Sequence, residues 1–146
     1  FLHADTSPQP GWGHAVDAFL RDAANRYRAG YFRFALNDPS PKARRLEALV
    51  DWRCRFLALP YGDQGLLISR EFHDFIGGFR PMPLMEDVDI ARRIGRHRLK
   101  QLPIAAVTSA ERYKKDGYWL RPARNLACVG LYFLGVPPDM IGSLYE

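Results

Sequence analysis

Three carboxylates stand close together at Glu86, Asp87 and Asp89, directly after a loop that contains two glycines and two prolines. A carboxylate can accept the proton of a hydroxyl group and so act as a general base. Acids also begin helices, where they face unpaired backbone N–H groups and the positive end of the helix dipole. Apolar residues recur at helical spacing from Val88 to Ile94, so a helix is expected here under either interpretation.

A second acidic feature lies at the other end of the chain, in Phe1-Leu2-His3-Ala4-Asp5-Thr6. The apolar start predicts the end of a buried strand, with Asp5 at its C-terminal tip. Open α/β sheets hold their ligands at that edge, which favours a functional carboxylate. The alternative for Asp5 is an ordinary turn or N-cap aspartate, because aspartate is common in turns.

Four short motifs together resemble a known family. They are His3-Ala4-Asp5, Tyr61-Gly62-Asp63-Gln64-Gly65, Gly77-Gly78-Phe79 and Glu86-Asp87. In this order and at this spacing, the chain resembles a family 2 glycosyltransferase of the GT-A fold, from a subgroup of small bacterial members. The resemblance spans nearly the whole sequence.

The resemblance implies the inverting transfer of a sugar from a nucleotide-sugar donor to an acceptor hydroxyl. In that reaction Asp87 would be the general base. Glu86 would orient the acceptor or tune Asp87 through its like charge. Asp89 is assigned to solvent or to the helix terminus.

The resemblance also implies a divalent cation, Mg²⁺ or Mn²⁺, to neutralise the leaving diphosphate. Asp5 is the expected ligand. The family pattern is Asp-x-Asp, and His3 stands in place of its first acid. The protein would therefore hold the ion less firmly, or through His3 itself if the ion is Mn²⁺.

Two further groups of residues are expected to contact the substrates. Gly77 and Gly78 would let the backbone approach the donor sugar, although a helix C-cap explains them equally well. An aromatic ring beside hydrogen-bonding groups suits a sugar, so an acceptor pocket is expected at Tyr61, Asp63 and Gln64. The alternative for these three residues is a plain turn.

The segment Ser109–Tyr113 resembles the Gln-x-x-Arg-Trp motif of processive relatives, with serine for glutamine and tyrosine for tryptophan. These replacements speak against polymer synthesis. Arg112 is expected to close over the pyrophosphate and stabilise its developing charge. A solvated basic loop is the competing interpretation.

Strands and helices alternate along the chain, which indicates an α/β fold. Helices are expected at 12–26, 41–57, 70–76, 85–95 and 118–134 and after Pro137-Pro138, strands at 1–4, 31–36, 65–69 and 99–107, and a mobile polar segment at 108–117. Ser40 would cap the second helix and Pro41 would begin it. That helix is expected to bury Leu46, Leu49, Val50 and either Trp52 or Phe56.

The resemblance makes this fold a partial GT-A domain with a mixed, mainly parallel sheet flanked by helices. Residues 1–146 would be its acceptor-side, C-terminal portion, without the N-terminal strands that grip the nucleotide. We therefore expect the 146 residues alone to bind nucleotide sugars poorly and to turn over little. An unpaired edge at Phe1–Ala4 would also invite another chain to pair, which leaves a homodimer open.

Bulk composition supports a single packed unit, with 47% hydrophobic and 25% charged residues. The net charge of +5 attracts anions without choosing among nucleic acid, acidic lipid and sugar diphosphate. No nucleic-acid-binding motif occurs, so nucleic acid is not an expected partner. Cys54 and Cys128 form no CxxC pair, which favours a reducing, cytoplasmic compartment.

The longest apolar run, Leu126–Val136, is shorter than the roughly 18 residues that a spanning helix needs. Arg121 and Arg124 beside it leave peripheral attachment to the inner membrane open. Two other functions compete with glycosyl transfer. One is a nucleotidyltransferase on a similar sheet, and the other is a non-catalytic basic binding domain.

Overall fold

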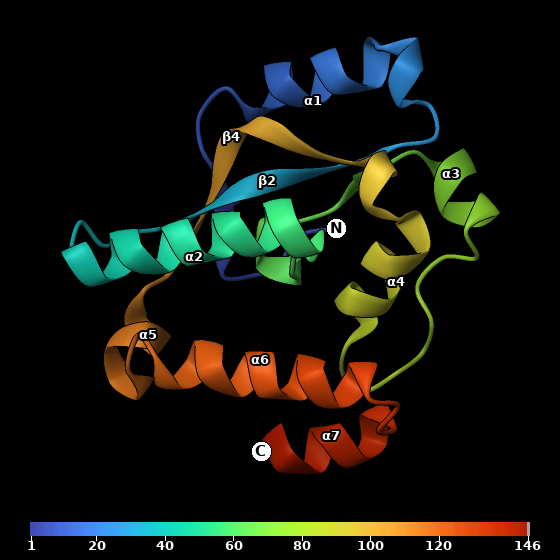
Figure 1. Ribbon diagram of the computed structural model, residues 1–146. Helices are drawn as coiled ribbons and strands as arrows, with labels where there is room; N and C mark the ends of the chain where they lie inside the picture. Colours follow the sequence, from blue (N-terminus) through green and yellow to red (C-terminus); the bar gives the residue numbers. More distant parts are fainter. Residues whose placement is uncertain (146) are drawn as a thin grey trace.

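The computed structural model describes residues 1–145, with side chains at all of these positions except 116, 121 and 143–145. Four strands alternate with helices in this part of the chain (Figure 1): β1 (Thr6–Pro8), α1 (Trp12–Arg21), β2 (Ala29–Leu36), α2 (Pro41–Leu57), β3 (Leu67–Ile68), α3 (Arg70–Phe75), α4 (Glu86–Ile94), β4 (Leu99–Thr108), α5 (Glu111–Asp116), α6 (Leu120–Phe133) and α7 (Pro138–Tyr145). The α/β class expected from the sequence is confirmed.

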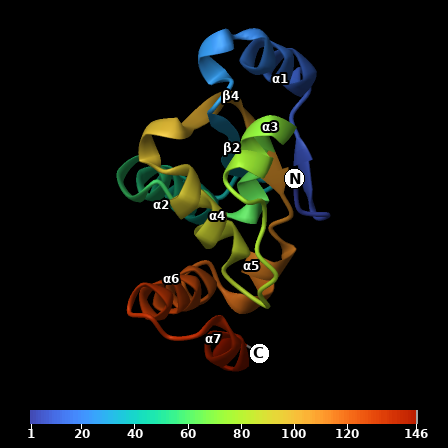
Figure 2. The same cartoon turned by 90° about the vertical axis from the view of Figure 1, so that its right-hand side faces the viewer.

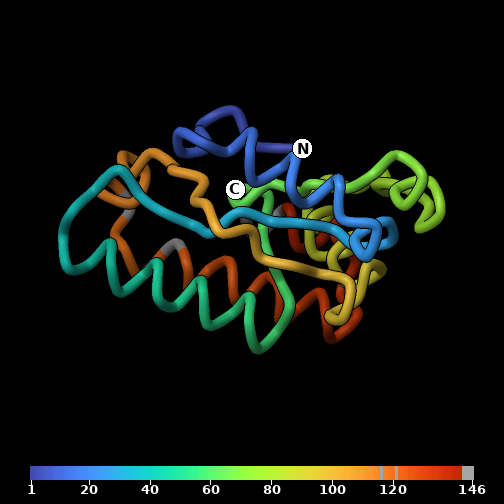
Figure 3. The backbone as a smooth tube through the Cα atoms, turned by 90° about the horizontal axis from the view of Figure 1, so that it is seen from above, coloured from blue at the N-terminus to red at the C-terminus, as the bar shows by residue number. Residues whose placement is uncertain are grey.

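The sheet has the strand order β1-β4-β2-β3. Its longest pairing, between β2 and β4, is parallel, whereas β1 with β4 and β2 with β3 are antiparallel. The sheet is therefore mixed, as expected, and its central pairing is the parallel one. Seen from above, β2 and β4 run between α1 on one side and α2 on the other (Figure 3). Phe19 of α1 packs on Phe32 and Leu102, whereas α2 packs on the opposite face.

Helix α2 begins where its sequence signals predict. The Ser40 hydroxyl accepts a hydrogen bond from the Ala43 backbone N–H at 3.3 Å, and Pro41 occupies the first turn. The buried stripe of this helix consists of Ala43, Leu46, Val50 and Cys54. Leu49, Trp52 and Phe56 are exposed, so the expected burial of Leu49 and of either Trp52 or Phe56 is wrong. A helix that covers one face of a sheet buries a single stripe, and these three lie outside it.

One other local expectation is also wrong. Residues 1–4 form no strand: the backbone of Phe1 exchanges a pair of hydrogen bonds with Leu66, and the first strand is Thr6–Pro8. The polar segment 108–117, for which no helix was expected, contains α5.

A second layer lies below the sheet. Figures 1 and 2 show α6 and α7 packed side by side there, with α4 between them and the sheet. Val88 of α4, Val129 of α6 and Ile141 of α7 share one buried apolar cluster. Among the described residues, no helix combines the length and apolar character needed to cross a bilayer.

Candidate active site

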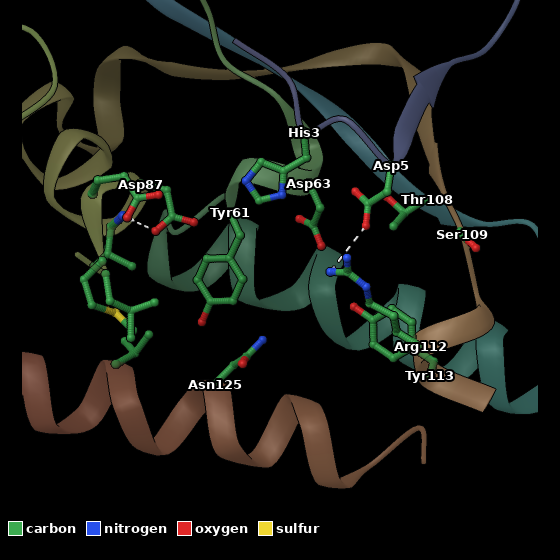
Figure 4. A pocket seen from close by; sticks show the side chains of 15 residues that line it. His3, Asp5, Tyr61, Asp63, Asp87, Thr108, Ser109, Arg112, Tyr113 and Asn125 are labelled. Atoms are coloured by element: carbon green, nitrogen blue, oxygen red, sulfur yellow. Dashed lines mark hydrogen bonds and ion pairs between the residues drawn. The ribbon is translucent and has the colours of Figure 1, made fainter. Parts of the chain in front are cut away.

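A cavity of about 200 Å³ opens where β4 ends, α4 begins and α6 passes beneath them (Figure 4). Seven of the residues singled out in the sequence line it: His3, Asp5, Tyr61, Asp63, Glu86, Asp87 and Arg112. Asp5 and Asp87 come from opposite ends of the motif series, and the fold brings both to this one cavity. It lies at the C-terminal edge of the parallel pair β2 and β4, the edge at which open α/β sheets hold ligands.

Asp5 reaches this edge by a different route from the one expected. It lies in a turn directly before β1 rather than at the tip of a strand. Strand β1 pairs with β4 so that Thr6 lies opposite Thr108, and the Thr6 and Thr108 hydroxyls are 2.9 Å apart. The Ser109 backbone N–H also donates to the Asp5 carbonyl at 3.4 Å. These contacts fix Asp5 beside the end of β4.

The carboxylate of Asp87 is held by backbone donors on both of its oxygens. Oδ2 accepts from the Gly62 N–H at 3.0 Å, and Oδ1 accepts from the Val88 N–H at 2.7 Å. Each carboxylate oxygen retains another lone pair. Asp87 is thereby oriented without losing its capacity to accept a proton from a ligand in the cavity.

Met85 sets the direction in which α4 begins. Its backbone φ is 71°, in the left-handed region, although the residue is not glycine. Such a conformation costs about 1 kcal/mol or more and persists only where the surroundings enforce it. The Met85 side chain is buried in the cluster between α4 and α6, and its carbonyl accepts the Asp89 N–H at 2.8 Å. The strained turn therefore lies immediately before Glu86 and Asp87.

Gln64 organises the turn that carries Tyr61 and Asp63. Its side chain is completely buried, and its amide donates to the Phe32 carbonyl at 3.3 Å. Its Oε1 accepts from the Arg53 guanidinium at 3.1 Å and from the Tyr61 N–H at 3.3 Å. Gln64 does not line the cavity. The expected contact between Gln64 and the acceptor is thus replaced by a structural role.

Tyr61 forms a wall of the cavity and is supported from behind by Arg53. The guanidinium carbon of Arg53 lies 3.4 Å from the centroid of the Tyr61 ring, and its Nε donates to the Leu59 carbonyl at 2.9 Å. Burial raises the pKa of the Tyr61 hydroxyl, so the phenol stays protonated and can donate a hydrogen bond.

His3 packs against Gly62, where a larger residue would displace the imidazole ring. A Cβ on Gly62 would lie 2.2 Å from His3 Nε2. The Nε2 edge of the imidazole is therefore turned towards the Gly62 backbone, which leaves Nδ1 as the ring nitrogen that could meet a ligand.

Asp5 faces Arg112 at the mouth of the cavity, with Oδ2 3.7 Å from the guanidinium Nη1 (Figure 4). Both side chains are partly in solvent, so this ion pair is weak and can open. Among the described residues, no group of three or more His, Cys, Asp or Glu side chains is placed to hold a metal ion. Asp5 nevertheless fits the way Mg²⁺ commonly binds, through one or two carboxylates together with substrate phosphates.

Gly77 and Gly78 lie away from the cavity. Their N–H groups donate to the Asp74 and His73 carbonyls at 3.0 and 2.8 Å, which ends α3. Both have positive φ, and a Cβ on Gly78 would meet the His73 ring at 2.8 Å. The alternative interpretation, a helix C-cap, therefore accounts for both glycines. Neither glycine lines the cavity, where a contact with the donor sugar was expected.

Asp89 is buried, so its expected place in solvent is wrong, whereas the alternative place at the helix terminus is confirmed by its position in the first turn of α4. Its carboxylate forms ion pairs with Arg93 at 2.7 Å and Arg80 at 3.2 Å, and accepts from the Tyr132 hydroxyl at 3.4 Å. These contacts tie α4 to the preceding loop and to α6. Asp89 thus helps to hold the helix that presents Asp87.

Asn125, for which no sequence pattern predicted a role, rises from α6 towards Tyr61 (Figure 4). Among the described residues, the buried Oδ1 atoms of Asn125 and Asp63 have no hydrogen-bond partner. Because buried polar atoms are nearly always paired, these two oxygens of the cavity are free to accept hydrogen bonds from a ligand or from water. Asn125 comes from the apolar stripe of α6, where periodicity gave no signal of function.

A second cavity of about 240 Å³ adjoins the first and shares His3, Tyr61, Glu86 and Asp87 with it. Its other walls are mainly apolar and include Leu66, Phe79 and Ile90. The Asp87 carboxylate therefore stands between a polar and an apolar space.

Comparisons with protein-family models, with curated proteins and with solved structures find no match to this chain.

Burial raises the pKa of the Asp63 carboxyl, with further increases from Asp87 and Asp5 and opposing effects from Arg53 and His3. An acid with a raised pKa binds its proton more tightly in the folded state than in the unfolded state. The contribution of this carboxyl group to the free energy of unfolding therefore falls as the pH rises from its pKa in the unfolded chain towards its raised pKa in the folded chain. We expect Asp63→Asn to be more stable than the wild type at pH ~7 and to lose this advantage as the medium becomes acidic.

Urea unfolding of both proteins between about pH 4 and 8 measures this effect. Asp17→Asn, which removes an exposed acid of α1, is the matched control and should change stability little at any pH. A stability difference between Asp63→Asn and wild type that stays constant with pH would contradict the interpretation.

Proposed function

We propose that this chain forms the acceptor side of a GT-A-type, family 2 glycosyltransferase. The enzyme would move a sugar from a nucleotide-sugar donor to an acceptor hydroxyl by inverting displacement. The observation that carries the proposal is the meeting of Asp5 and Asp87 in one cavity with His3, Asp63 and Arg112. Carboxylates, an imidazole and a guanidinium around a sugar-sized space supply a base, hydrogen-bonding groups and a partner for a diphosphate.

Asp87 is the proposed general base. As the acceptor oxygen forms its bond to the anomeric carbon, the bond from that carbon to the diphosphate oxygen breaks on the opposite face. The acceptor proton passes to a free lone pair of the Asp87 carboxylate. Backbone donors at 3.0 and 2.7 Å keep the carboxylate in place during this step. Glu86 lines both cavities and would orient the acceptor.

Asp5 and Arg112 are proposed to serve the leaving group. A bound Mg²⁺ or Mn²⁺ would neutralise part of the diphosphate charge, with Asp5 and Nδ1 of His3 as the protein groups able to hold it. Arg112 at 3.7 Å from Asp5 would turn to the diphosphate when the donor enters. Its guanidinium could then stabilise the charge that develops on the departing oxygen.

Asp63, Asn125 and Tyr61 are proposed to recognise hydroxyl groups of the bound sugar or acceptor. The two orphaned oxygens can each accept a hydrogen bond from a hydroxyl group, and the Tyr61 phenol can donate one. Gln64 and Arg53 would act only by holding this turn in place.

Product analysis tests the proposal. The full natural chain is incubated with a panel of nucleotide sugars and Mn²⁺ or Mg²⁺, and the released nucleotide is separated by chromatography. Glycosyl transfer releases a nucleoside diphosphate. Transfer of a nucleotidyl group, with release of pyrophosphate or of a sugar phosphate, would instead assign the cavity to a nucleotidyltransferase. Absence of both products across the panel would leave the cavity to a binding role and overturn the proposal.

A further inference from the structure

A continuous apolar face lies outside the candidate active site, on the solvent side of α2. Leu49, Trp52 and Phe56 follow one another at helical spacing on this side, with Trp52 and Phe56 51% and 58% exposed. The two aromatic rings contact each other, with centroids 5.6 Å apart. Apolar side chains scattered singly over a surface are normal, but a contiguous patch of large ones usually marks an interaction site.

Helix α6 extends this face. A groove between α2 and α6 is lined by Leu49, Trp52 and Leu57 from one helix and by Leu126 from the other. Leu126 is 59% exposed. In Figure 1 the two helices run side by side across the front of the molecule. We call Leu49, Trp52, Phe56, Leu57 and Leu126 the α2–α6 face.

Helix α2 brings an excess of positive charge to the α2–α6 face, with five Lys and Arg residues against two acids. Arg44 pairs with Glu47 at 2.6 Å and Arg55 with Asp51 at 2.9 Å, and Arg53 supports Tyr61 and Gln64. Lys42 and Arg45, near the start of α2, therefore carry the excess charge beside this face. The sequence of α6 contains no acid.

Exposed apolar side chains and basic side chains also lie together at the turn into α6. Trp119 and Leu120 are largely exposed there and line a shallow hollow with Lys42 and Lys114. Aromatic rings and long basic side chains both suit a boundary between water and lipid, because each has an apolar body and a polar or charged tip.

We propose that the α2–α6 face docks on the surface of an anionic lipid membrane. Trp52, Phe56 and Leu126 would enter the headgroup region, and the surrounding Lys and Arg side chains would contact lipid phosphates. Amphipathic surfaces with aromatic residues on an apolar side and basic residues around it bind membranes in this way. The proposal does not depend on glycosyl transfer.

A second copy of the chain fits this face less well. A symmetric dimer would place the same patch of both subunits in contact, and each basic rim would then oppose the other. Anionic headgroups complement that charge. The α2–α6 groove also shares Tyr61, Asp63, Tyr113 and Asn125 with the candidate active site. Docking would bring that cavity close to the lipid surface.

Co-sedimentation with vesicles tests the proposal, using phosphatidylcholine vesicles with and without phosphatidylglycerol. The chain should bind the vesicles that contain phosphatidylglycerol, more weakly at high salt, and bind pure phosphatidylcholine poorly. Trp52→Ser with Phe56→Ser should lower binding roughly tenfold, since two aromatic rings lose their burial in lipid. Lys42→Gln with Arg45→Gln should lower binding to the anionic vesicles by a similar factor.

The matched control is Trp12→Ser with Leu20→Ser. These residues are similarly exposed but lie on α1, across the sheet from α2. This control pair should bind like the wild type, and thermal unfolding should show that all variants remain folded. Failure to bind anionic vesicles, or equal loss in the control pair, would overturn the proposal. A dimer in sedimentation that only the Trp52→Ser, Phe56→Ser variant abolishes would assign the face to a second copy instead.

Discussion

Replacing Asp87 with asparagine is expected to lower turnover by about 10²–10⁴-fold, the usual contribution of a general base. Asparagine has nearly the same shape, but its single carbonyl oxygen can accept from only one of the two backbone N–H groups, Gly62 or Val88, that now donate to the Asp87 carboxylate at 3.0 and 2.7 Å. Water in the open cavity can accept from the other N–H. Asparagine cannot accept the acceptor proton. The fold should therefore survive while the chemical step fails. Initial rates of nucleoside diphosphate release, measured on the full natural chain, test this expectation.

Two comparisons separate the role of Asp87 from a general loss of negative charge. Glu86→Gln removes the neighbouring carboxylate of the same cavity and should reduce turnover less, because Glu86 only orients the acceptor. Asp17→Asn removes an exposed acid on α1 and should leave turnover unchanged. Equal rates for wild type and Asp87→Asn would remove Asp87 from the mechanism.

Asp89→Asn is expected to reduce the free energy of unfolding by about 3 kcal/mol. The carboxylate of Asp89 is buried and pairs with Arg93 at 2.7 Å, and the Arg93 side chain is only 17% exposed. Removing one partner of such a pair leaves the other charge in a poorly solvated place. Urea unfolding monitored by circular dichroism gives the change directly.

The exposed pair Asp17 and Arg21, 3.7 Å apart on α1, provides the comparison for Asp89. Asp17→Asn should cost less than about 0.5 kcal/mol, because water screens an exposed ion pair. If the two substitutions cost the same, the Asp89 network does not hold α4 against α6 as the structure suggests.

Local signals in the sequence were sufficient for most of the helices. Ser40 and Pro41 begin α2 where predicted, because capping and the fixed φ of proline act within one turn. Which apolar residues face inwards was harder to predict. Leu49, Trp52 and Phe56 look like core residues by type, but their burial depends on whether another layer covers α2, and that is a property of the tertiary fold.

The acidic residues of the candidate site could be predicted from the sequence, whereas the other residues that shape the site could not. The motif resemblance indicated that Asp5 and Asp87 act together, and both line the cavity. No local pattern could show that Gln64 points inwards, because its partners Arg53 and Phe32 lie outside its own turn. Asn125 was missed for the same reason, since only the packing of α6 below the sheet places it at the cavity.

The left-handed backbone at Met85 has a consequence for how this segment can change during evolution. One residue turns an α-helix by about 100°, so an insertion between Met85 and Asp87 would rotate the carboxylate away from Gly62. The loop between Gly78 and Met85 has no such angular constraint. Natural versions of the chain should therefore differ in length before Met85, while the spacing from Met85 to Asp87 stays invariant.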